Sequence, residues 1–243
     1  MMEMKAMIFA AGLGTRLQPI TNNCPKALIK LNGKPLIWYA VNKLIGCGVT
    51  QIVVNIHHFG EQIIDYFKEN CFNVPIFFSD ERDFLLDTGG GLSKAREYLQ
   101  DSSTIIAYNA DIISAVDLKK VIEFHQQHQP LATLVVRHRE TSRYLHFDDE
   151  MHLSGWKNIE TGEEKISTQK FYTSNKFAFS GIQVLSPELF DLITETGKFS
   201  VVDLYLRLAK EHAIKGFLDQ SEYWLDLGKQ GQIEAAEKLL SQH

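Results

Sequence analysis

The amino-acid sequence predicts an α/β fold, with a mostly parallel β-sheet covered by helices on both faces and a small antiparallel insert. Three observations support this prediction. Short apolar segments alternate with amphipathic helical patterns through residues 5–136, which is typical of repeated β-α-β units. This rhythm breaks at about residue 137, where a polar stretch begins, and it returns near residue 177. The length of 243 residues suits one large domain with a substantial core.

The first half of the chain gives the clearest secondary-structure signals. Apolar residues four positions apart, Leu36, Ala40 and Leu44, mark a helix that Pro35 can start and Gly48 can end. The strands are short apolar runs rich in β-branched residues. In this half we expect strands at residues 5–10, 51–56, 75–78, 104–108 and 132–136, and helices at residues 36–45, 61–69, 91–99 and near 118–122.

The second half begins with a polar, turn-rich stretch at residues 137–175. Its weak alternation indicates antiparallel hairpin strands or a lid, so we expect a single domain over residues 1–243 with an insert at about 137–175. Ser186 and Pro187 mark one helix start, and Ser200 is expected to cap another helix. The remaining expected elements are strands at residues 177–184, 214–218 and 223–227 and a last helix at 230–240.

Composition and charge restrict the classes of function. The chain has 25 lysines and arginines against 30 aspartates and glutamates, a formal net charge of −5, so no basic excess is present to hold a nucleic acid. No apolar run approaches the roughly 18 residues of a membrane span. Three cysteines without CxxC spacing indicate free thiols in a reducing compartment. We therefore expect a cytoplasmic protein with neither nucleic-acid nor membrane partners; the sequence does not predict its oligomeric state.

The strongest local signal is a glycine-rich loop directly after the first strand, with the sequence AAGLGTRLQP at residues 10–19. Ligands of open α/β sheets bind where loops leave the carboxyl ends of the strands, and glycines let backbone N–H groups approach phosphates closely. Arg16 and Lys26 add two cations to this region. The loop is not a dinucleotide fingerprint, because Leu17 stands at the third glycine position, and no GxxxxGK[ST] motif occurs. We predict a phosphate-binding loop of another kind.

The loop and the Pro25-Lys26 step resemble the signature of the sugar-1-phosphate nucleotidyltransferases. Other segments that are similar to this family follow in its order: LDTGGG at 86–91, NAD at 109–111, FSGI at 179–182 and WLDLG at 224–228. The sequence looks most similar to the short N-acetylmuramate-1-phosphate uridylyltransferases. The resemblance implies a Rossmann-like nucleotidyltransferase fold of the GT-A-like type. It also implies an enzyme that joins a sugar 1-phosphate to a nucleoside triphosphate, with UTP favoured, and releases pyrophosphate.

The same resemblance implies roles for individual residues. Asp111 and Asp226, which each follow a strand, would hold Mg²⁺ through oxygen ligands. Arg16 and Lys26 would be the catalytic cations that neutralise the triphosphate. The other implied contacts are with the nucleotide at Ala11, Gly12, Gly14, Thr15, Glu81, Thr88, Gly89 and Asn109, and with the sugar at Gly90, Ser180 and Gly181.

Two departures from the family pattern leave alternatives open. Ala110 stands where the family usually has the glycine of Asn-Gly-Asp, and Ala27 stands where many sugar enzymes have a second proline. The Pro-Lys-Ala step is similar to that of the phosphocholine cytidylyltransferases, which would need an aromatic cage for a quaternary ammonium. Candidate rings for such a cage are Trp156, Phe171, Tyr172 and Trp224. A non-catalytic nucleotide-binding regulator is the second alternative. The base stays open between uracil, guanine, thymine and cytosine, and the sugar between muramate, mannose, glucose and a heptose.

Overall fold

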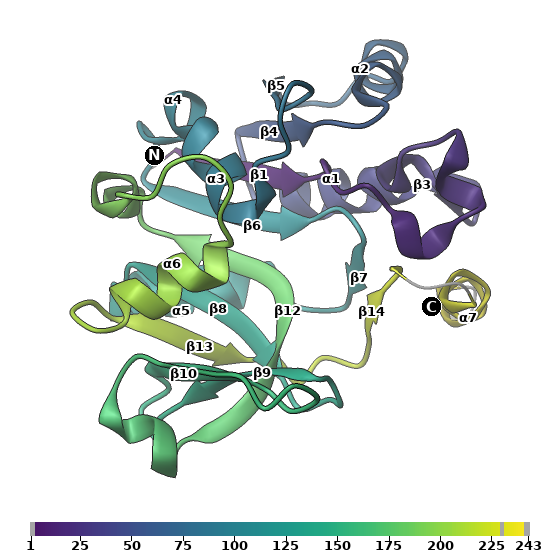
Figure 1. Cartoon of the computed structure of the whole chain (residues 1–243). Helices are drawn as coiled ribbons and strands as arrows, with labels where there is room; N and C mark the ends of the chain where they lie inside the picture. The colour runs from purple at the N-terminus through teal and green to yellow at the C-terminus, as the bar shows by residue number, and fades with distance from the viewer. Residues whose placement is uncertain (1–2, 229–230, 241–243) are drawn as a thin grey trace.

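The structure is a computed structural model that describes residues 3–228 and 231–240. Its main element is a ten-stranded mixed sheet, in which eight strands follow the order β11-β10-β9-β12-β6-β1-β4-β5 and β8 and β13 extend from β12 (Figure 1). The four strands β5, β4, β1 and β6 pair in parallel. The predicted α/β fold with a parallel core is confirmed. The bounds of these four strands are Met4–Phe9 (β1), Gln51–Ile56 (β4), Ile76–Asp80 (β5) and Thr104–Asn109 (β6).

Helices cover both faces of the parallel core because successive side chains of a strand point to opposite faces. In β1, Ala6 and Ile8 belong to one core cluster and Met7 belongs to the other. The first cluster includes apolar residues of α1, α2 and α5, and the second includes those of α3, α4 and α6 (Figure 1). These helices are Leu36–Gly46 (α1), Gly60–Glu69 (α2), Asp87–Lys94 (α3), Arg96–Leu99 (α4), Leu118–His128 (α5) and Val201–Leu208 (α6).

The other half of the sheet is largely antiparallel. The long strand β12 runs antiparallel to β6, β8 and β9, and only β13 pairs in parallel with β8 there. The segment at 132–136, expected to continue the parallel series, therefore joins the sheet through β12. Residues 143–166 supply three antiparallel strands at the sheet edge, as the predicted small insert requires. The strands are Ala132–Arg137 (β8), Arg143–Phe147 (β9), Leu153–Asn158 (β10), Glu164–Ile166 (β11), Asn175–Leu185 (β12) and Ile214–Leu218 (β13).

Several short elements differ from the sequence prediction. The helix expected at 91–99 begins earlier, at Asp87, and is divided at Ala95 into α3 and α4. The segment after Ser186 is a 3-10 helix, whereas Ser200 caps α6 by accepting a hydrogen bond from the N–H of Val202. Residue 230 of the last expected helix lies outside the described residues. Short elements that the sequence did not predict are β2 (Lys30–Leu31), β3 (Lys34–Pro35), β7 (Ile112–Ser114) and the 3-10 helices Thr15–Leu17, Ile20–Asn22, Lys26–Leu28 and Gln169–Thr173.

The end of the chain returns to the parallel core. Strand β14 (Trp224–Asp226) pairs with β7 in an antiparallel two-stranded sheet, and α7 (Gln232–Leu240) follows it (Figure 1). This return brings Asp226 opposite Ile112, next to Asp111 in the chain. Among the described helices, none has the length and apolar character needed to cross a membrane. The three cysteines carry free thiols.

Candidate active site

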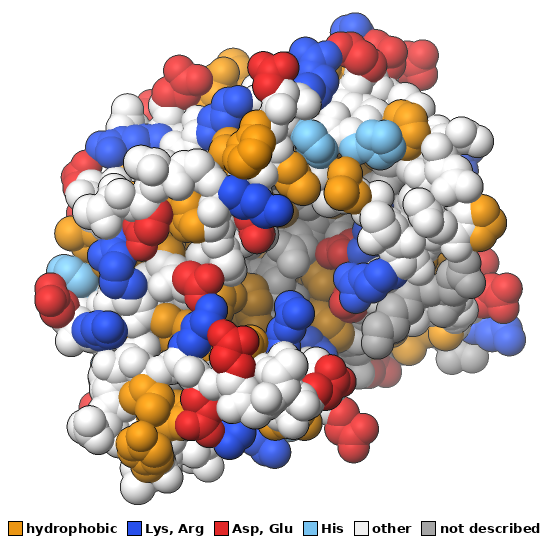
Figure 2. All heavy atoms as spheres, in the orientation of Figure 1, with side chains coloured by type: hydrophobic (Ala, Val, Ile, Leu, Met, Phe, Trp, Pro, Cys, Tyr) orange, Lys and Arg blue, Asp and Glu red, His pale blue; other side chains and the backbone are white. Residues whose placement is uncertain are grey.

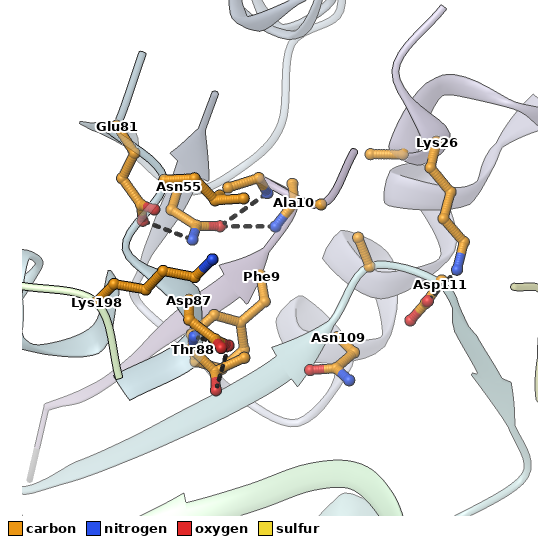
Figure 3. Close-up of a pocket in the computed structure, with 15 residues that line it drawn as sticks. Phe9, Ala10, Lys26, Asn55, Glu81, Asp87, Thr88, Asn109, Asp111 and Lys198 are labelled. Carbon is orange, nitrogen blue, oxygen red and sulfur yellow. Dashed lines mark hydrogen bonds and ion pairs between the residues drawn. The ribbon is translucent and has the colours of Figure 1, made fainter. Parts of the chain in front are cut away.

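A pocket of about 350 Å³ lies at the carboxyl ends of the parallel strands. Figure 2 shows that this face of the molecule is hollowed, and Figure 3 shows the lining side chains. The pocket therefore lies where ligands of open α/β sheets bind. The residues that line it are Phe9, Ala10, Ala11, Gly12, Lys26, Ala27, Asn55, Glu81, Leu85, Asp87, Thr88, Asn109, Ala110, Asp111 and Lys198.

The two predicted metal ligands and the two predicted cations come together beside this pocket. Lys26 forms an ion pair with Asp111, and its Nζ lies 3.9 Å from Oδ1 of Asp226. The backbone joins the two acidic segments as well, since the N–H of Leu227 donates to the carbonyl oxygen of Asp111 over 3.0 Å. Asp111 and Asp226 are 115 positions apart in the chain, and both contact Lys26. Their predicted proximity is therefore observed.

Gly228 shows where Arg16 lies in this cluster. A Cβ atom added at Gly228 would lie 2.7 Å from Oδ1 of Asp226, 3.0 Å from Nη2 of Arg16 and 3.1 Å from Nζ of Lys26. Three charged side chains therefore converge around one point that only glycine leaves open, and Asp111 joins them through its ion pair with Lys26. In the sequence Gly228 is the last residue of the WLDLG motif, and no role was predicted for it. Its structural role is to leave room for these charges.

The two glycines of the loop differ in the space around them: Gly12 has room for a ligand beside it, and Gly14 does not. A Cβ at Gly12 would meet no atom within 4 Å, so a ligand can approach the backbone there. Gly14 has a φ of 66°, and a Cβ on it would lie 2.9 Å from Cγ2 of Thr21. Thr21 also donates a hydrogen bond to the carbonyl oxygen of Gly14 over 2.8 Å. Gly14 is thus required by the turn itself, which leads into the 3-10 helix that begins at Thr15 and carries Arg16.

Asn55, which the sequence analysis did not select, holds the start of the loop. Its Oδ1 accepts hydrogen bonds from the N–H groups of Ala10, over 2.7 Å, and Ala11, over 3.2 Å (Figure 3). Its Nδ2 donates to Oε1 of Glu81 over 2.8 Å, and Oε2 of Glu81 accepts from the N–H of Leu86 over 3.0 Å. The N–H of Ala11, expected to face phosphate, is therefore already bonded within the protein. A polar residue near the end of a buried strand was the available signal for Asn55.

Glu81 lines the pocket, although only 1% of its surface is exposed. Burial raises the pKa of its carboxyl group, and the hydrogen bonds from Leu86 and Asn55 oppose that rise. Since both oxygens already have partners in the protein, the structure gives Glu81 a role in ordering Asn55 and residue 86. Direct contact of Glu81 with a nucleotide stays a prediction.

The N-terminal turn of α3 meets the pocket through Asp87 and Thr88. Gly89 and Gly90 face the segment 197–199 instead: an added Cβ would collide with the ring of Phe199 at Gly89 and with the carbonyl oxygen of Gly197 at Gly90. The N–H of Gly89 also donates to the carbonyl oxygen of Phe199 over 2.9 Å. Close packing between α3 and this segment explains both glycines. The predicted ligand contacts of Gly89 and Gly90 stay predictions.

Two of the predicted sugar-binding residues lie beside Asn109. Gly181 has a φ of 72°, and a Cβ on it would lie 2.7 Å from Nδ2 of Asn109. Ser180 is fully buried, and within the described part of the chain its hydroxyl group has no hydrogen-bond partner. The structure therefore brings Ser180, Gly181 and Asn109 together, whereas Gly90 lies apart from them against Gly197.

The two departures from the family pattern are accommodated by the core. Ala27 and Ala110 are 2% and 4% exposed, and both belong to the cluster on one face of the sheet. The N–H of Ala110 donates to the carbonyl oxygen of Phe9 over 3.1 Å. The methyl group at 110 is therefore packed in the core. Lys198 is a further cation that lines the pocket; no motif marked it in the sequence (Figure 3).

Three of the four rings proposed for a choline cage already have partners within the protein. Trp224 stacks with the Arg139 guanidinium at 4.2 Å, and Trp156 lies under the Lys165 ammonium at 5.4 Å. Phe171 is 5% exposed and packs on the ring of His146. Because cations of the protein already cover both tryptophans, this arrangement does not favour the phosphocholine alternative.

Comparison with known proteins gives the family. The model of the nucleotidyl transferase family matches residues 5–242. The chain belongs to this family. A mannose-1-phosphate guanyltransferase of Schizosaccharomyces pombe is 32% identical over 233 residues, which cover 93% of this chain and 61% of the relative. The chain thus spans about three fifths of the length of the curated relatives that it matches.

Solved structures of nucleotidyltransferases share the fold. HddC from Yersinia pseudotuberculosis, complexed with GMP-PN, aligns with a TM-score of 0.76 at 25% identity, over 99% of this chain and 100% of the other. A UTP-bound UGPase from Acinetobacter baumannii aligns with a TM-score of 0.82 at 16% identity, over 100% and 95% of the two chains. The nucleotidyltransferase fold is therefore confirmed. The curated relatives carry the name mannose-1-phosphate guanyltransferase, so they do not support the finer assignment to the N-acetylmuramate branch.

Proposed function

We propose that the protein transfers a nucleotidyl group from a nucleoside triphosphate to a sugar 1-phosphate and releases pyrophosphate. The observation that carries this proposal is a charged cluster at the edge of the pocket, in which Arg16, Lys26 and Asp226 meet around Gly228 and Asp111 pairs with Lys26. Two cations and two carboxylates at the carboxyl end of a sheet suit a polyphosphate and a divalent cation. The family of the chain supports the same reaction class.

The proposed reaction is a displacement at phosphorus. An oxygen of the sugar phosphate attacks the α-phosphorus, the new O–P bond forms, and the bond to the oxygen that bridges to the β-phosphate breaks, so that pyrophosphate leaves with the electron pair. Catalysis then consists mainly of orienting two anions and neutralising their charge. Lys26 is suited to neutralise charge at the α-phosphate and Arg16 to bind phosphate oxygens through its fork of donors. The open backbone at Gly12 offers room for phosphates.

Mg²⁺ fits the donor set at Asp111 and Asp226. Within residues 3–228 and 231–240, Oδ1 of Asp226 is buried and has no hydrogen-bond partner, which leaves one carboxylate oxygen available to a cation. Magnesium prefers one or two carboxylates together with phosphate oxygens. When bound, it would supply positive charge at the phosphates during the displacement. Lys26 already contacts both carboxylates, so its ammonium group is near the phosphates that they would gather.

Two pairs of substrates are candidates for this reaction. The TGGG, FSGI and WLDLG segments are similar to those of N-acetylmuramate-1-phosphate uridylyltransferases, which favours UTP. The names of the curated relatives favour GTP with mannose 1-phosphate. We also propose that the chain acts as a single domain in the cytoplasm and that the segment at 137–175 borders the sugar.

The test is a panel of reactions with Mg²⁺ in which released pyrophosphate is measured. GTP, UTP, CTP and dTTP are each combined with mannose 1-phosphate, glucose 1-phosphate, N-acetylmuramate 1-phosphate and phosphocholine. Turnover with a sugar 1-phosphate, abolished by a chelator, is the expected result. Turnover with phosphocholine alone would establish the cytidylyltransferase alternative instead. Binding of a triphosphate without turnover in any combination would support the non-catalytic regulator.

A further inference from the structure

Four buried polar atoms without hydrogen-bond partners lie on residues around Trp224, and the count covers only the described residues. One is Oγ of Ser114, which is paired opposite Trp224 on β7, and the other three are Nε of Arg139, Oγ of Ser180 and Oδ1 of Asp226. Arg139 stacks on the Trp224 ring, and Nε1 of Trp224 donates to the carbonyl oxygen of Ser180 over 2.9 Å. Asp226 is two residues from Trp224 on β14, so both side chains leave the same face of that strand. Because buried polar atoms are normally paired, this group indicates contact with a ligand.

Arg139 is held in a fixed position by three contacts. Its Nη2 donates to the carbonyl oxygen of Phe179 over 2.9 Å, its Nη1 donates to the carbonyl oxygen of Glu140 over 3.3 Å, and its guanidinium carbon lies 4.2 Å from the centre of the Trp224 ring. None of these contacts involves an anion. Among the residues that the structure describes, no carboxylate lies within 4.0 Å of Arg139, whereas nearby Arg137 pairs with Asp219 at 3.0 Å.

The half-buried charge of Arg139 therefore lacks a counterion in direct contact. Burial lowers the pKa of the guanidinium, and the negative charge of Asp226 raises it. An arginine side chain nevertheless stays protonated in proteins, so the charge persists. A half-buried cation with no carboxylate within 4.0 Å among the described residues is best satisfied by an anionic ligand whose oxygens accept from its remaining N–H groups.

The position of Arg139 distinguishes it from the cations that serve the triphosphate. Arg16 and Lys26 reach the charged cluster from the glycine-rich loop and the segment after it. Arg139 approaches Asp226 from the β8–β9 connection, beside Ser180 on β12. Two anions must meet in the proposed reaction, and a separate cation on this side would orient the second one.

We propose that Arg139, stacked on Trp224, binds the phosphate group of the acceptor sugar 1-phosphate and orients it next to Asp226. This inference rests on the proposed function and extends it to a residue that belongs to none of the sequence motifs. The planar fork of the guanidinium suits the phosphate oxygens, and the Trp224 ring fixes the plane of that fork.

The test measures initial rates for the whole chain with mannose 1-phosphate and GTP, and with N-acetylmuramate 1-phosphate and UTP. In Arg139→Met the KM for the sugar 1-phosphate should rise at least ~10-fold, the loss expected for a charge-assisted hydrogen bond, while the KM for the triphosphate stays within about twofold. Arg139→Lys should recover part of the loss, since it keeps the charge but not the fork. Arg96→Met, a change at an exposed arginine on α4, should leave both KM values unchanged.

Outcomes that overturn the inference are distinct from failure of the proposed function. If the wild-type chain turns over neither pair and no other sugar 1-phosphate, the proposed function fails before any variant is compared, and the inference falls with it. If the wild type is active and Arg139→Met leaves the KM for the sugar 1-phosphate unchanged, or raises both KM values equally, only the role of Arg139 is wrong. Should Arg139→Met fail to fold, Arg139→Gln is judged by the same two KM values.

Discussion

The two sides of the Asp111–Asp226 pair differ in how completely the protein satisfies their polar atoms. On the loop side, Asn55 binds Ala10, Ala11 and Glu81, and Glu81 also binds residue 86, so these buried groups satisfy one another. Only Oγ of Ser79, opposite Asn55 on β5, lacks a partner there among the described residues. On the β12 side, the hydroxyl group of Ser180 and Nε of Arg139 lack partners within the described chain. We infer that the polar groups of the Asn55 network are hydrogen-bonded before any ligand binds. The unpaired polar groups on the β12 side instead find their partners in the acceptor sugar 1-phosphate.

The largest expected effect is a loss of kcat when Asp111 or Asp226, which lie between the two sides, is changed. Asp111→Asn or Asp226→Asn should lower kcat at least ~100-fold, because charge stabilisation by a bound metal is worth several kcal/mol. The fold should persist, since both carboxylates are partly exposed. Steady-state rates over a range of Mg²⁺ concentrations provide the measurement. Glu150→Gln, which changes an exposed acid on the β9–β10 turn, is the matched control and should retain full activity. Near-normal rates in both aspartate variants would refute the assignment of the metal ligands.

Asn55→Ala tests the hydrogen-bond network on the loop side. It would leave the N–H groups of Ala10 and Ala11 and the carboxylate of Glu81 short of a partner, at a cost of about 3 kcal/mol in the free energy of unfolding. For a chain of this size that corresponds to a fall in Tm of roughly 6–12 °C. Thermal unfolding followed by circular dichroism measures this shift. A Tm within about 2 °C of the wild type would mean that Asn55 does not order the loop.

Ser180→Ala makes the opposite test on the β12 side and has the smallest expected effect. Removing a buried hydroxyl group that has no partner should leave Tm unchanged or slightly raised. If that hydroxyl binds the acceptor, the KM for the sugar 1-phosphate should rise about 3- to 10-fold, as expected for one neutral hydrogen bond. Steady-state kinetics and thermal unfolding are measured on the same sample. A marked loss of stability with an unchanged KM for the sugar 1-phosphate would mean that the Ser180 hydroxyl group stabilises the fold and does not bind the acceptor. That result would contradict the proposed difference between the two sides.

Motifs in the sequence predicted most of the charged cluster, because Arg16, Lys26 and Asp111 lie in segments that follow the ends of parallel strands. Parallel strands bring their carboxyl ends to one edge, so a loop after β1 and an aspartate after β6 had to meet there. Asp226 could be added only through the family resemblance, because its position depends on the pairing of β14 with β7, two three-residue strands with little signal of their own.

Residues whose role depends on contacts between distant segments could not be predicted. Gly89 and Gly90 gave no sign in the sequence of their close packing against the segment 197–199. Arg139 and Lys198 are single cations in polar stretches, and only folding shows that one stacks on Trp224 and the other lines the pocket. Local sequence patterns predict secondary structure and the order of motifs. These roles instead depend on contacts between residues that are more than 50 positions apart in the chain.

The most direct test of the central claim is a crystal structure with Mn²⁺ and a non-hydrolysable nucleoside triphosphate, examined by anomalous scattering from the manganese. We predict one metal peak roughly 2.0–2.2 Å from carboxylate oxygens of both Asp111 and Asp226 and from an oxygen of the triphosphate. Lys26 and Arg16 should contact phosphates in the same complex. A triphosphate bound with its metal on neither aspartate, for instance at the group formed by Asp148, Glu150 and His152, would contradict the account.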